Sequence, residues 1–183
     1  MQVTTTPIPD LFLLNINVHK DERGFFAETW REEWSGKINL PGPFIQCNHA
    51  RSEAKGVLRG LHFQAPPSAQ SKLVWVTRGA VYDVAVDLRM GSPTYGQWHG
   101  VVLSAENMLR FFVPRGFAHG YMTVEPGTEF HYMVDNYYDP SSEGGIRWDD
   151  SDLNIGWPDI EPVLSAKDRV LPALRDFTSP FTL

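Results

Sequence analysis

The residues with the most chemical promise lie in segments that otherwise alternate like β-strands. In the segment GVLRGLHFQ, alternation places His62 on one face of the strand and its apolar neighbours Leu61 and Phe63 on the other. An imidazole that points into a barrel could be a general base, a metal ligand or a hydrogen-bonded core histidine. Arg59 in the same segment could bind an anion, although a lone arginine is more often solvated at the surface. The segment by itself leaves these alternatives open.

A second histidine and a tyrosine occur in similar surroundings further along the chain. His119 follows a Pro-Arg-Gly turn and could share a metal with His62, but neither belongs to an HxH pair and no carboxylate follows His62 at short spacing. Tyr132 shares one strand face with Phe130 and Val134, so its phenol is predicted to point inward among apolar groups. A buried tyrosine usually ties its hydroxyl to a carbonyl, yet it could also pass a proton to a carbanion.

Charged side chains share one face of the segment from Ser71 to Arg89. This segment alternates on both sides of an Arg78-Gly79 turn, which predicts a β-hairpin. Its polar face carries one lysine and two aspartates: Lys72, Asp83 and Asp87. That face needs partners or a ligand if it lines an interior, whereas an outward face would be solvated. Asp168 follows Ser165 at the capped start of a predicted helix, and only a tertiary contact would give it another role.

Together, these side chains supply what is needed to remove a proton next to a carbonyl group. His62 would be the base, Tyr132 the acid and Lys72 the cation that stabilises an enolate. Arg59 and Arg23 would bind an anionic part of the substrate. Such a reaction needs neither a metal nor an organic cofactor, and we expect none. The chain also lacks GxGxxG, GxxxxGKS/T, HExxH, GxSxG and CxxC motifs, which argues against nicotinamide and P-loop enzymes.

The elements that must position these side chains are predicted to be short strands. Aromatic residues make up 13% of the 183 residues, and 15 Gly and 14 Pro supply turns. Besides the hairpin, strand patterns fall at residues 11–18, 25–29, 44–49, 56–64, 98–103, 108–113, 120–124 and 129–134. Helical patterns are confined to residues 28–38 and 165–176, and Pro172 interrupts the second. Residues 1–183 are therefore predicted to form a single all-β domain, a sandwich, barrel or jelly roll with short terminal helical segments.

Composition and charge argue against several classes of partner. The formal net charge of −6 and a pI near 5.4 argue against a nucleic-acid-binding protein. Cys47 is the only cysteine, which excludes an internal disulfide and a multi-cysteine zinc site. The N-terminus has no signal-peptide pattern, and no apolar run approaches the ~18 residues of a membrane span. We therefore expect no membrane partner and a cytoplasmic location.

The order and spacing of many sequence blocks carry a family resemblance. From Asp21 to Asp168 the chain contains DERGFFAETW, FIQCN, GVLRGLHFQ, QSKLVWV, DVAVDLR, SPTYGQW, VPRGFAHGY, IRWDDSDLNIGWP and LSAKD. In these blocks it resembles the dTDP-4-dehydrorhamnose 3,5-epimerases. The resemblance implies a cupin-like jelly roll, or double-stranded β-barrel. The implied reaction converts dTDP-4-dehydro-6-deoxy-D-glucose into dTDP-4-dehydro-L-rhamnose.

The resemblance also implies catalytic roles for four residues. His62 would remove the protons at C3 and C5, which the C4 ketone acidifies. Asp168 would orient His62 and stabilise its imidazolium, a pairing that sequence spacing alone does not indicate. Tyr132 would return a proton from the opposite face of the sugar ring, and Lys72 would lie at the C4 oxygen and hold the enolate charge.

Further positions match family contacts to a dTDP-linked 4-keto-6-deoxysugar. Tyr138 would stack on thymine, and the other substrate contacts would be Arg23, Glu28, Gln46, Cys47, Asn48, Arg59, His119, Glu143 and Lys167. In the family a neighbouring subunit lends the strand that contains Arg23 and Glu28. The resemblance therefore implies a homodimer with N-terminal strand exchange. Arginine side chains can bind a diphosphate without a glycine-rich loop or Mg²⁺.

Some residues depart from the family pattern and leave alternatives open. After Tyr132 the family usually has Lys-Cys-Thr-Asp, whereas Met133, Val134, Asp135 and Asn136 follow here, and Cys47 replaces the usual aspartate. Relatives with the same base and acid epimerise only C3 or only C5, so a mono-epimerase is the second hypothesis. A non-catalytic or metal-binding cupin module is the third, although such a module has no reason to retain the complete catalytic set.

Overall fold

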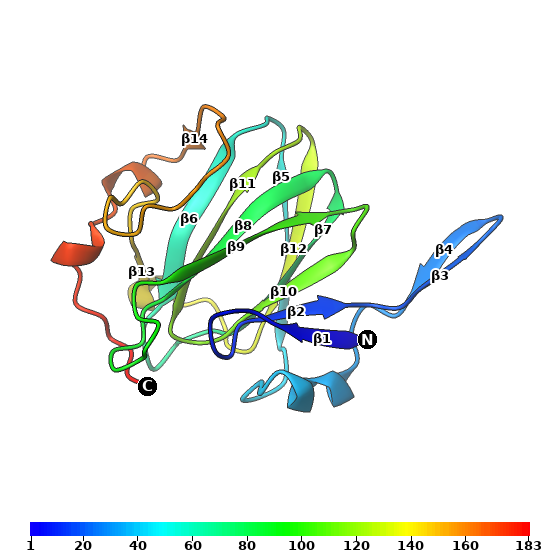
Figure 1. The fold of residues 1–183 in the computed structure, drawn as a ribbon, viewed down its shortest axis with the longest axis horizontal. Coiled ribbons are helices and arrows are strands. Elements are labelled where there is room, and N and C mark those ends of the chain that lie inside the picture. Colours follow the sequence, from blue (N-terminus) through cyan, green and yellow to red (C-terminus); the bar gives the residue numbers. More distant parts are fainter.

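The computed structural model describes residues 1–183, and its strands form two facing sheets (Figure 1). Sheet 1 is antiparallel and runs, from edge to edge, through β1 (Gln2–Thr5), β2 (Phe12–Asn15), β10 (Leu109–Val113), β7 (Lys72–Arg78), β12 (Thr128–Val134) and β5 (Gln46–Ser52). Sheet 2 runs through β13 (Glu143–Gly145), β6 (Val57–Gln64), β11 (Phe117–Thr123), β8 (Ala80–Asp87) and β9 (Trp98–Ser104). A short strand, β14 (Val163–Leu164), pairs in parallel with β6. The predicted all-β class is confirmed.

The main apolar core lies between the two sheets. Strand alternation directs every second side chain of the central strands into this space. Sheet 1 contributes Val74, Val76, Phe111, Val113 and Phe130, and sheet 2 contributes Val81, Ala85, Leu103, Phe117 and Tyr121. Burial of one such side chain contributes about 1.5–3 kcal/mol relative to exposure. This core fills part of the interior and holds the two walls of the remaining cavity in place.

The outer face of sheet 2 carries a second apolar cluster. Leu61 and Phe63 belong to it, together with Phe181 near the C-terminus. The C-terminal segment, red in Figure 1, runs over this face. The predicted alternation of β6 is therefore confirmed, since His62 faces the interior while its two neighbours face outward.

The predicted hairpin over Ser71–Arg89 is wrong, although its alternation is right. β7 pairs with β10 and β12, whereas β8 pairs with β11 and β9 in the other sheet. Gly79 makes the turn that carries the chain between the sheets, with a φ of +73° and no room for a side chain beside Thr128. Lys72 and Asp83 therefore belong to opposite walls of the interior.

Several predicted boundaries also differ from the observed ones. The predicted strand at 11–18 breaks into β2 and a separate β3 (Val18–Asp21), and β11 begins at Phe117, which places His119 inside a strand. β1, β13 and β14 lack a predicted counterpart because two to four residues are too few for a clear alternation.

The helical content consists of 3₁₀ turns only. They are η1 (Glu32–Lys37), η2 (Pro140–Ser142), η3 (Asp168–Val170) and η4 (Leu174–Asp176). Pro172 separates η3 from η4, as its missing N–H and fixed φ predict. None of these turns has the length and apolar character of a membrane-spanning helix.

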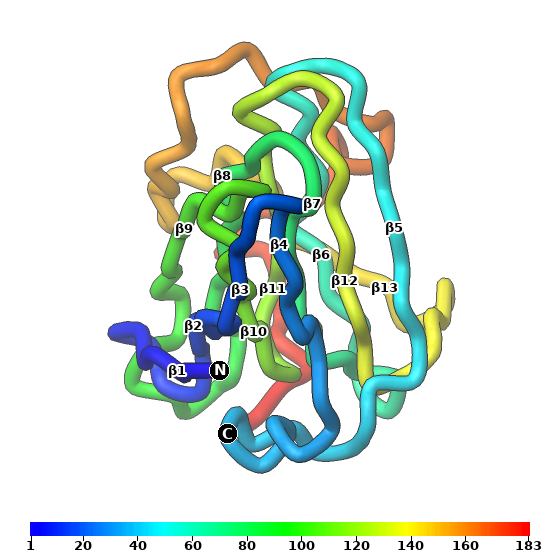
Figure 2. The backbone as a smooth tube through the Cα atoms, turned by 90° about the vertical axis from the view of Figure 1, so that its right-hand side faces the viewer, coloured from blue at the N-terminus to red at the C-terminus, as the bar shows by residue number.

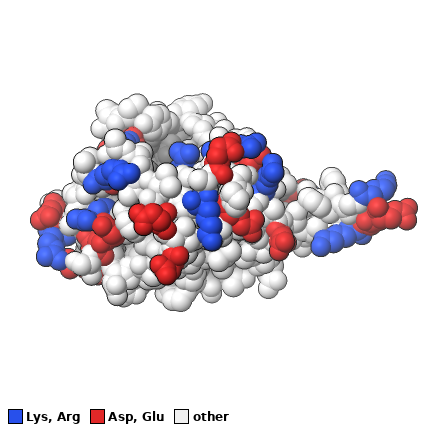
Figure 3. All heavy atoms as spheres, turned by 90° about the horizontal axis from the view of Figure 1, so that it is seen from above, with Lys and Arg blue, Asp and Glu red and all other residues white.

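One part of the chain projects from the two-sheet body. β3 pairs with β4 (Gly24–Ala27) in a two-stranded ribbon, here called the arm, that stands away from the body in Figure 1 and in front of it in Figure 2. Phe25 and Phe26 of the arm are 62% and 72% exposed. Charged groups of both signs gather at its tip (Figure 3). A two-stranded ribbon is marginally stable alone, and exposed phenylalanines on it indicate an interaction surface.

Candidate active site

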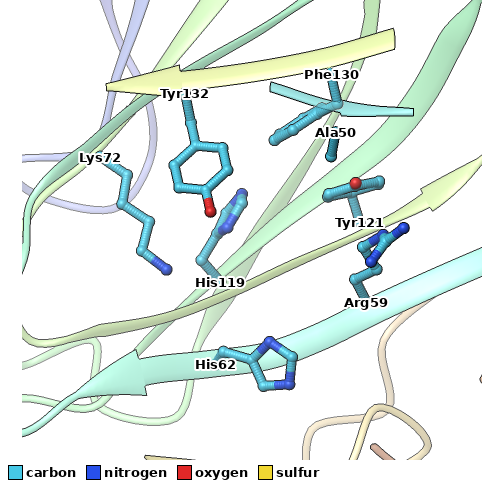
Figure 4. Close-up of a pocket in the computed structure, with 8 residues that line it drawn as sticks. All are labelled: Ala50, Arg59, His62, Lys72, His119, Tyr121, Phe130 and Tyr132. Atoms are coloured by element: carbon cyan, nitrogen blue, oxygen red, sulfur yellow. The ribbon is translucent and has the colours of Figure 1, made fainter. Parts of the chain in front are cut away.

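A cavity opens between the two sheets, and polar side chains from both walls point into it (Figure 4). Its lining comes from β6 and β11 of sheet 2 and from β5, β7 and β12 of sheet 1: Arg59, His62, His119, Tyr121, Ala50, Lys72, Phe130 and Tyr132. Inward and outward positions alternate along each strand, so His119 and Tyr121 on β11, and Phe130 and Tyr132 on β12, are two residues apart. Arg59 and His62 on β6 are three residues apart, and both line the cavity because the pairing of β6 with β11 shifts register between them. The structure thus brings His62, Lys72 and Tyr132 into one cavity.

His62 forms a close pair with a carboxylate from a distant part of the chain. Its Nε2 lies 2.5 Å from Oδ1 of Asp168, whose residue is only 4% exposed. Asp168 is itself held by Ser165, whose hydroxyl donates to Oδ2 at 2.8 Å and accepts from the Asp168 backbone N–H at 3.1 Å. A carboxylate at Nε2 fixes the proton there and leaves Nδ1 as the nitrogen that can accept a proton.

The surroundings of His62 favour its neutral form. Burial lowers the pKa of His62 below its ordinary value of 6.5, and the charge of Lys72 acts in the same direction. Asp168 opposes this shift because a carboxylate stabilises the imidazolium. The His62 side chain is still 26% exposed. A neutral, partly accessible imidazole with an oriented tautomer has the properties of a general base.

Tyr132 and Lys72 enter the cavity from the wall opposite His62. In Figure 4 the Tyr132 hydroxyl and the Lys72 ammonium group both point across the cavity toward the β6 side. Burial raises the pKa of Tyr132, so the phenol keeps its proton, although Arg59 opposes the shift. Burial lowers the pKa of Lys72 to about 8, against the attraction of Asp83 and Glu143. The cavity therefore places a proton donor and a cation opposite a base.

A second His–Asp pair lies in the wall of the same cavity. His119 Nε2 lies 2.8 Å from Oδ1 of Asp83, and both residues are buried. The sequence predicts that Asp83 shares a strand face with Lys72 but leaves open whether that face points inward or outward, and no role follows for Asp83 from the sequence motifs. The signal that could have found it is the same alternation that places Lys72 inward.

Several predicted nucleotide contacts gather at one edge of the cavity. Glu143 lies on β13, whose Gly145 is the register partner of His62 on β6. The Tyr138 hydroxyl donates to Glu143 at 2.8 Å, and Lys167 forms an ion pair with the same carboxylate. Strand β5 adds the side-chain amides of Gln46 and Asn48, and Gln46 Nε2 donates to Asn48 Oδ1 at 2.8 Å. The backbone N–H of Tyr138 donates to Gln46 Oε1 at 3.3 Å.

Comparisons with known proteins agree with this arrangement of side chains. Residues 5–176 match the family model described as dTDP-4-dehydrorhamnose 3,5-epimerase. This chain belongs to the dTDP-4-dehydrorhamnose 3,5-epimerase family. The enzyme of that name from Salmonella typhimurium is 50% identical over 176 residues, which are 95% of this chain and 96% of that protein.

Solved structures of the family have the same fold. The crystal structure of the epimerase from Elizabethkingia anophelis matches with a TM-score of 0.91 at 45% identity and covers 96% of this chain and 97% of that chain. The 3,5-epimerase from Legionella pneumophila, solved in complex with dTDP-4-keto-L-rhamnose, matches with a TM-score of 0.93 at 42% identity, covering 97% and 94%. The predicted family, cupin-like fold and isomerase class are confirmed, and the predicted 3,5-epimerase function is confirmed at the level of the family.

Less similar relatives include mono-epimerases. The dTDP-4-dehydrorhamnose 3-epimerase from Streptomyces niveus is 37% identical over 150 residues, 81% of this chain and 72% of that protein. A 3'-monoepimerase from Streptomyces bikiniensis in complex with dTDP-quinovose matches with a TM-score of 0.86 at 34% identity, covering 93% and 86%. Proteins with this fold therefore include both 3,5-epimerases and mono-epimerases.

Three predicted substrate contacts of this epimerase lie outside the cavity of its own chain. Cys47 is exposed and lies on the face of β5 opposite Gln46 and Asn48, so its side chain does not point into the cavity. Arg23 is on the arm, where it pairs with Asp21 and its side chain is 84% exposed. Glu28 follows the arm and pairs with Arg31 at 2.7 Å.

One group of side chains has the composition of a metal site, but it lies outside the cavity. His49, Glu129 and His131 place ligand atoms within 4.8 Å of one another on β5 and β12. The two imidazoles stack with centroids 4.1 Å apart and planes 11° apart, and His131 Nε2 lies 2.9 Å from the Thr77 hydroxyl. Stacked rings direct their nitrogen lone pairs side by side rather than toward one ion. In the cavity, His62 and His119 each face a carboxylate instead.

Proposed function

We propose that this epimerase inverts C3 and C5 of dTDP-4-dehydro-6-deoxy-D-glucose, with His62 as base and Tyr132 as acid. The observation that carries the proposal is the placement of these two side chains on opposite walls of one cavity (Figure 4). Inversion requires that a proton leaves one face of the sugar ring and another arrives on the other face. A ring held between β6 and β12 would present one face to each side chain.

His62 is the proposed acceptor of the C3 and C5 protons. The ketone at C4 acidifies both carbons, because the carbanion formed at either one delocalises onto the C4 oxygen. Nδ1 of His62 takes the proton, and the carboxylate of Asp168 at Nε2 stabilises the imidazolium that results. The partial exposure of His62 allows the proton to leave to solvent before the second carbon reacts.

Lys72 is the proposed partner of the enolate oxygen. A preorganised cation at the developing charge is worth about 10²- to 10³-fold in rate, by analogy with single oxyanion donors. Lys72→Ala is therefore expected to lower kcat far more than it raises KM. Equal effects on kcat and KM would instead make Lys72 a ground-state contact.

Tyr132 is the proposed donor on the opposite face. Its raised pKa keeps the phenol protonated at neutral pH. Support comes from the monoepimerase of Streptomyces bikiniensis, which was solved as a double mutant with His-to-Asn and Tyr-to-Phe changes, separated as His62 and Tyr132 are here. Tyr132→Phe is expected to spare some deuterium exchange at C3 and to abolish inversion. Normal turnover by Tyr132→Phe would contradict the assignment of the acid.

The nucleotide part of the substrate is proposed to lie along the edge formed by β5, β13 and the Tyr138 loop. Tyr138 offers an aromatic face for thymine and is held by Glu143, which also binds Lys167. Arg59 and Lys167 supply positive charge for the diphosphate. The remaining proposed contacts are Gln46, Asn48 and His119.

We also propose a homodimer in which the arm of each protomer completes the site of the other. β5 is an edge strand of sheet 1, so its outer edge is free to pair with another strand. The exposed Phe25 and Phe26 would be buried there, and Arg23 and Glu28 would reach the partner's cavity. Light scattering should give twice the chain mass, and Phe25→Ser/Phe26→Ser should give monomers that have lost activity. An active monomer would contradict strand exchange. The cytoplasmic location stays a prediction.

The second candidate is a C3-only epimerase, since such relatives share the fold. The curated 3,5-epimerases named above are more similar to this chain, with 50% identity for the Salmonella enzyme against 37% for the 3-epimerase. This difference favours double epimerisation.

Exchange in deuterated water tests the proposed reaction. The protein is incubated with dTDP-4-dehydro-6-deoxyglucose in D₂O, and the sugar is analysed by mass spectrometry and NMR. Deuterium at both C3 and C5, with a rhamno product trapped by a reductase, is the expected result. Deuterium at one carbon would identify a mono-epimerase, and no deuterium with a folded dimer would contradict the proposed function.

A further inference from the structure

Asp83 is a buried carboxylate in the cavity wall for which the proposed mechanism has no use. Its residue has 0% exposure, and Oδ1 accepts the hydrogen bond from His119 Nε2 at 2.8 Å. Its other oxygen, Oδ2, is equally buried and has no hydrogen-bond partner. Burying a carboxylate oxygen without a hydrogen-bond partner costs folding free energy, which suggests that this oxygen has another interaction.

Lys72 is a partly buried cation that likewise lacks a direct partner. Its ammonium group takes part in no hydrogen bond and in no close ion pair with any residue of the chain, although it is deeply placed in the cavity wall. The ionisable groups that face it come from four other strands: His62 on β6, Asp83 on β8, Tyr132 on β12 and Glu143 on β13. Only Asp83 and Glu143 have carboxyl groups, and Glu143 already pairs with Lys167. Burial raises the pKa of Asp83, while His119 and Lys72 favour its carboxylate form. Asp83 is therefore the main counter-charge available to Lys72.

We infer that Asp83 is a positioning residue that keeps Lys72 charged and holds His119 in one tautomer. This inference rests on the proposed roles of Lys72 at the enolate oxygen and of His119 at the substrate. Oδ1 serves His119, whose Nε2 must carry a proton to donate to it. Oδ2 is left free to act on Lys72 across the interior at a longer range than an ion pair.

The electrostatic consequence of removing the Asp83 charge has a definite sign. Burial already lowers the pKa of Lys72 to about 8, and Asp83 opposes that shift. Without Asp83 the pKa of Lys72 falls further, so the amine loses its proton at a lower pH. The enzyme needs the ammonium form to stabilise an enolate. The basic limb of its pH–rate profile should therefore move to lower pH.

Asp83→Asn separates the two roles of this residue. The asparagine keeps an oxygen that can accept from His119 Nε2, but it carries no charge. The chain has five lysines, so the ¹³Cε signal of Lys72 can be assigned by its absence in Lys72→Met and followed against pH. We expect its titration midpoint to fall by about one pH unit in Asp83→Asn. The pH midpoint of the basic limb of the kcat profile should move to lower pH by the same amount, with little change in KM.

Asp87 provides a matched control on the same strand and the same face. It is also 0% exposed, but its carboxylate binds Arg89, Ser92 and Thr94 outside the cavity. Asp87→Asn should lower stability without moving the Lys72 midpoint or the basic limb. An equal shift in Asp87→Asn, or no shift in Asp83→Asn, would overturn the inference.

A double variant keeps the test decisive if Asp83→Asn fails to fold. Lys72→Met/Asp83→Asn removes both buried charges. It should therefore fold even if a single variant, which leaves one buried charge without a counter-charge, does not. If Asp83 acts through Lys72, the double variant should be no slower than Lys72→Met alone, and a further tenfold loss of kcat would contradict this. The Lys72 midpoint is read without substrate, so a failure of the proposed epimerase function would leave this measurement intact.

Discussion

The two His–Asp pairs of this epimerase face one cavity but differ in how they are built. His62 and Asp168 are 106 positions apart in sequence, and Asp168 arrives on a 3₁₀ turn that packs beside β6. His119 and Asp83 lie on adjacent paired strands, β11 and β8, within the wall of sheet 2. The His62 side chain is 26% exposed, whereas that of His119 is 8% exposed.

The difference in exposure means that the His62–Asp168 pair can exchange protons with solvent, whereas the His119–Asp83 pair is held in one orientation. A base must lose its proton to solvent between the two carbon centres, and the exposed edge of His62 permits that. His119 is enclosed by the sheet, where its partner Asp83 gives one fixed hydrogen-bonding direction. The same two residue types are therefore assigned two proposed roles, catalysis for His62 with Asp168 and positioning for His119 with Asp83.

The largest expected effect comes from removing each imidazole in turn. His62→Ala should lower kcat by about 10³-fold or more and abolish deuterium exchange at C3 and C5, since His62 is the proposed acceptor of both protons. His119→Ala should keep exchange and mainly raise KM. Exchange measured by mass spectrometry decides between them, and loss of exchange in both variants would erase the distinction between the pairs.

The next effect comes from the carboxylate of the His62 pair. Asp168→Asn removes the charge that stabilises the imidazolium and can reverse the direction of the hydrogen bond at Nε2. We expect kcat to fall about 10²-fold or more. Stopped assays of product formation with a coupled reductase measure this effect. A loss below threefold would mean that Asp168 has no orienting role.

The pH dependence sharpens the comparison further. Burial lowers the pKa of His62 below 6.5, so the neutral base persists to lower pH than in an exposed histidine. Activity is lost as pH falls through that pKa, because the protonated imidazole accepts nothing. Asp168 opposes the lowering, so Asp168→Asn should move the acid limb of kcat/KM to still lower pH. His119→Gln serves as the control and should leave the acid limb where it is.

The smallest effect concerns Ser165, which exists as a support only in the His62 pair. Ser165→Ala removes the hydroxyl that donates to Asp168 Oδ2 at 2.8 Å. This hydroxyl acts on the reaction only through Asp168, so we expect about a 2- to 10-fold loss of kcat, the size of one ordinary hydrogen bond. Steady-state kinetics and thermal unfolding should be compared, because a change in stability with unaltered kcat would make Ser165 a purely structural contact.

The strand faces on which the proposed catalytic side chains lie could be predicted from local sequence. Alternation predicts that Tyr132 points inward and that His62 and Lys72 each lie on a defined strand face, and the structure shows that all three line the cavity. The partners of β7 and β8 could not be predicted in this way. The hairpin expected there failed because Gly79 sends the chain to the opposite sheet, and alternation is the same whichever strand lies beside it.

The sequence by itself determined the all-β class, which residues share a strand face, and the family, because side-chain alternation and ordered motifs are local properties of the chain. The pairing of Asp168 with His62 was implied by the family resemblance and not by residue spacing. Only the tertiary structure decided that Asp83 pairs with His119 and that Cys47 faces away from the cavity. Those relations depend on which strands become neighbours and on where the chain returns after more than a hundred residues. Residue spacing contains no such information, since contacts between distant segments are selected by the packing of the whole domain.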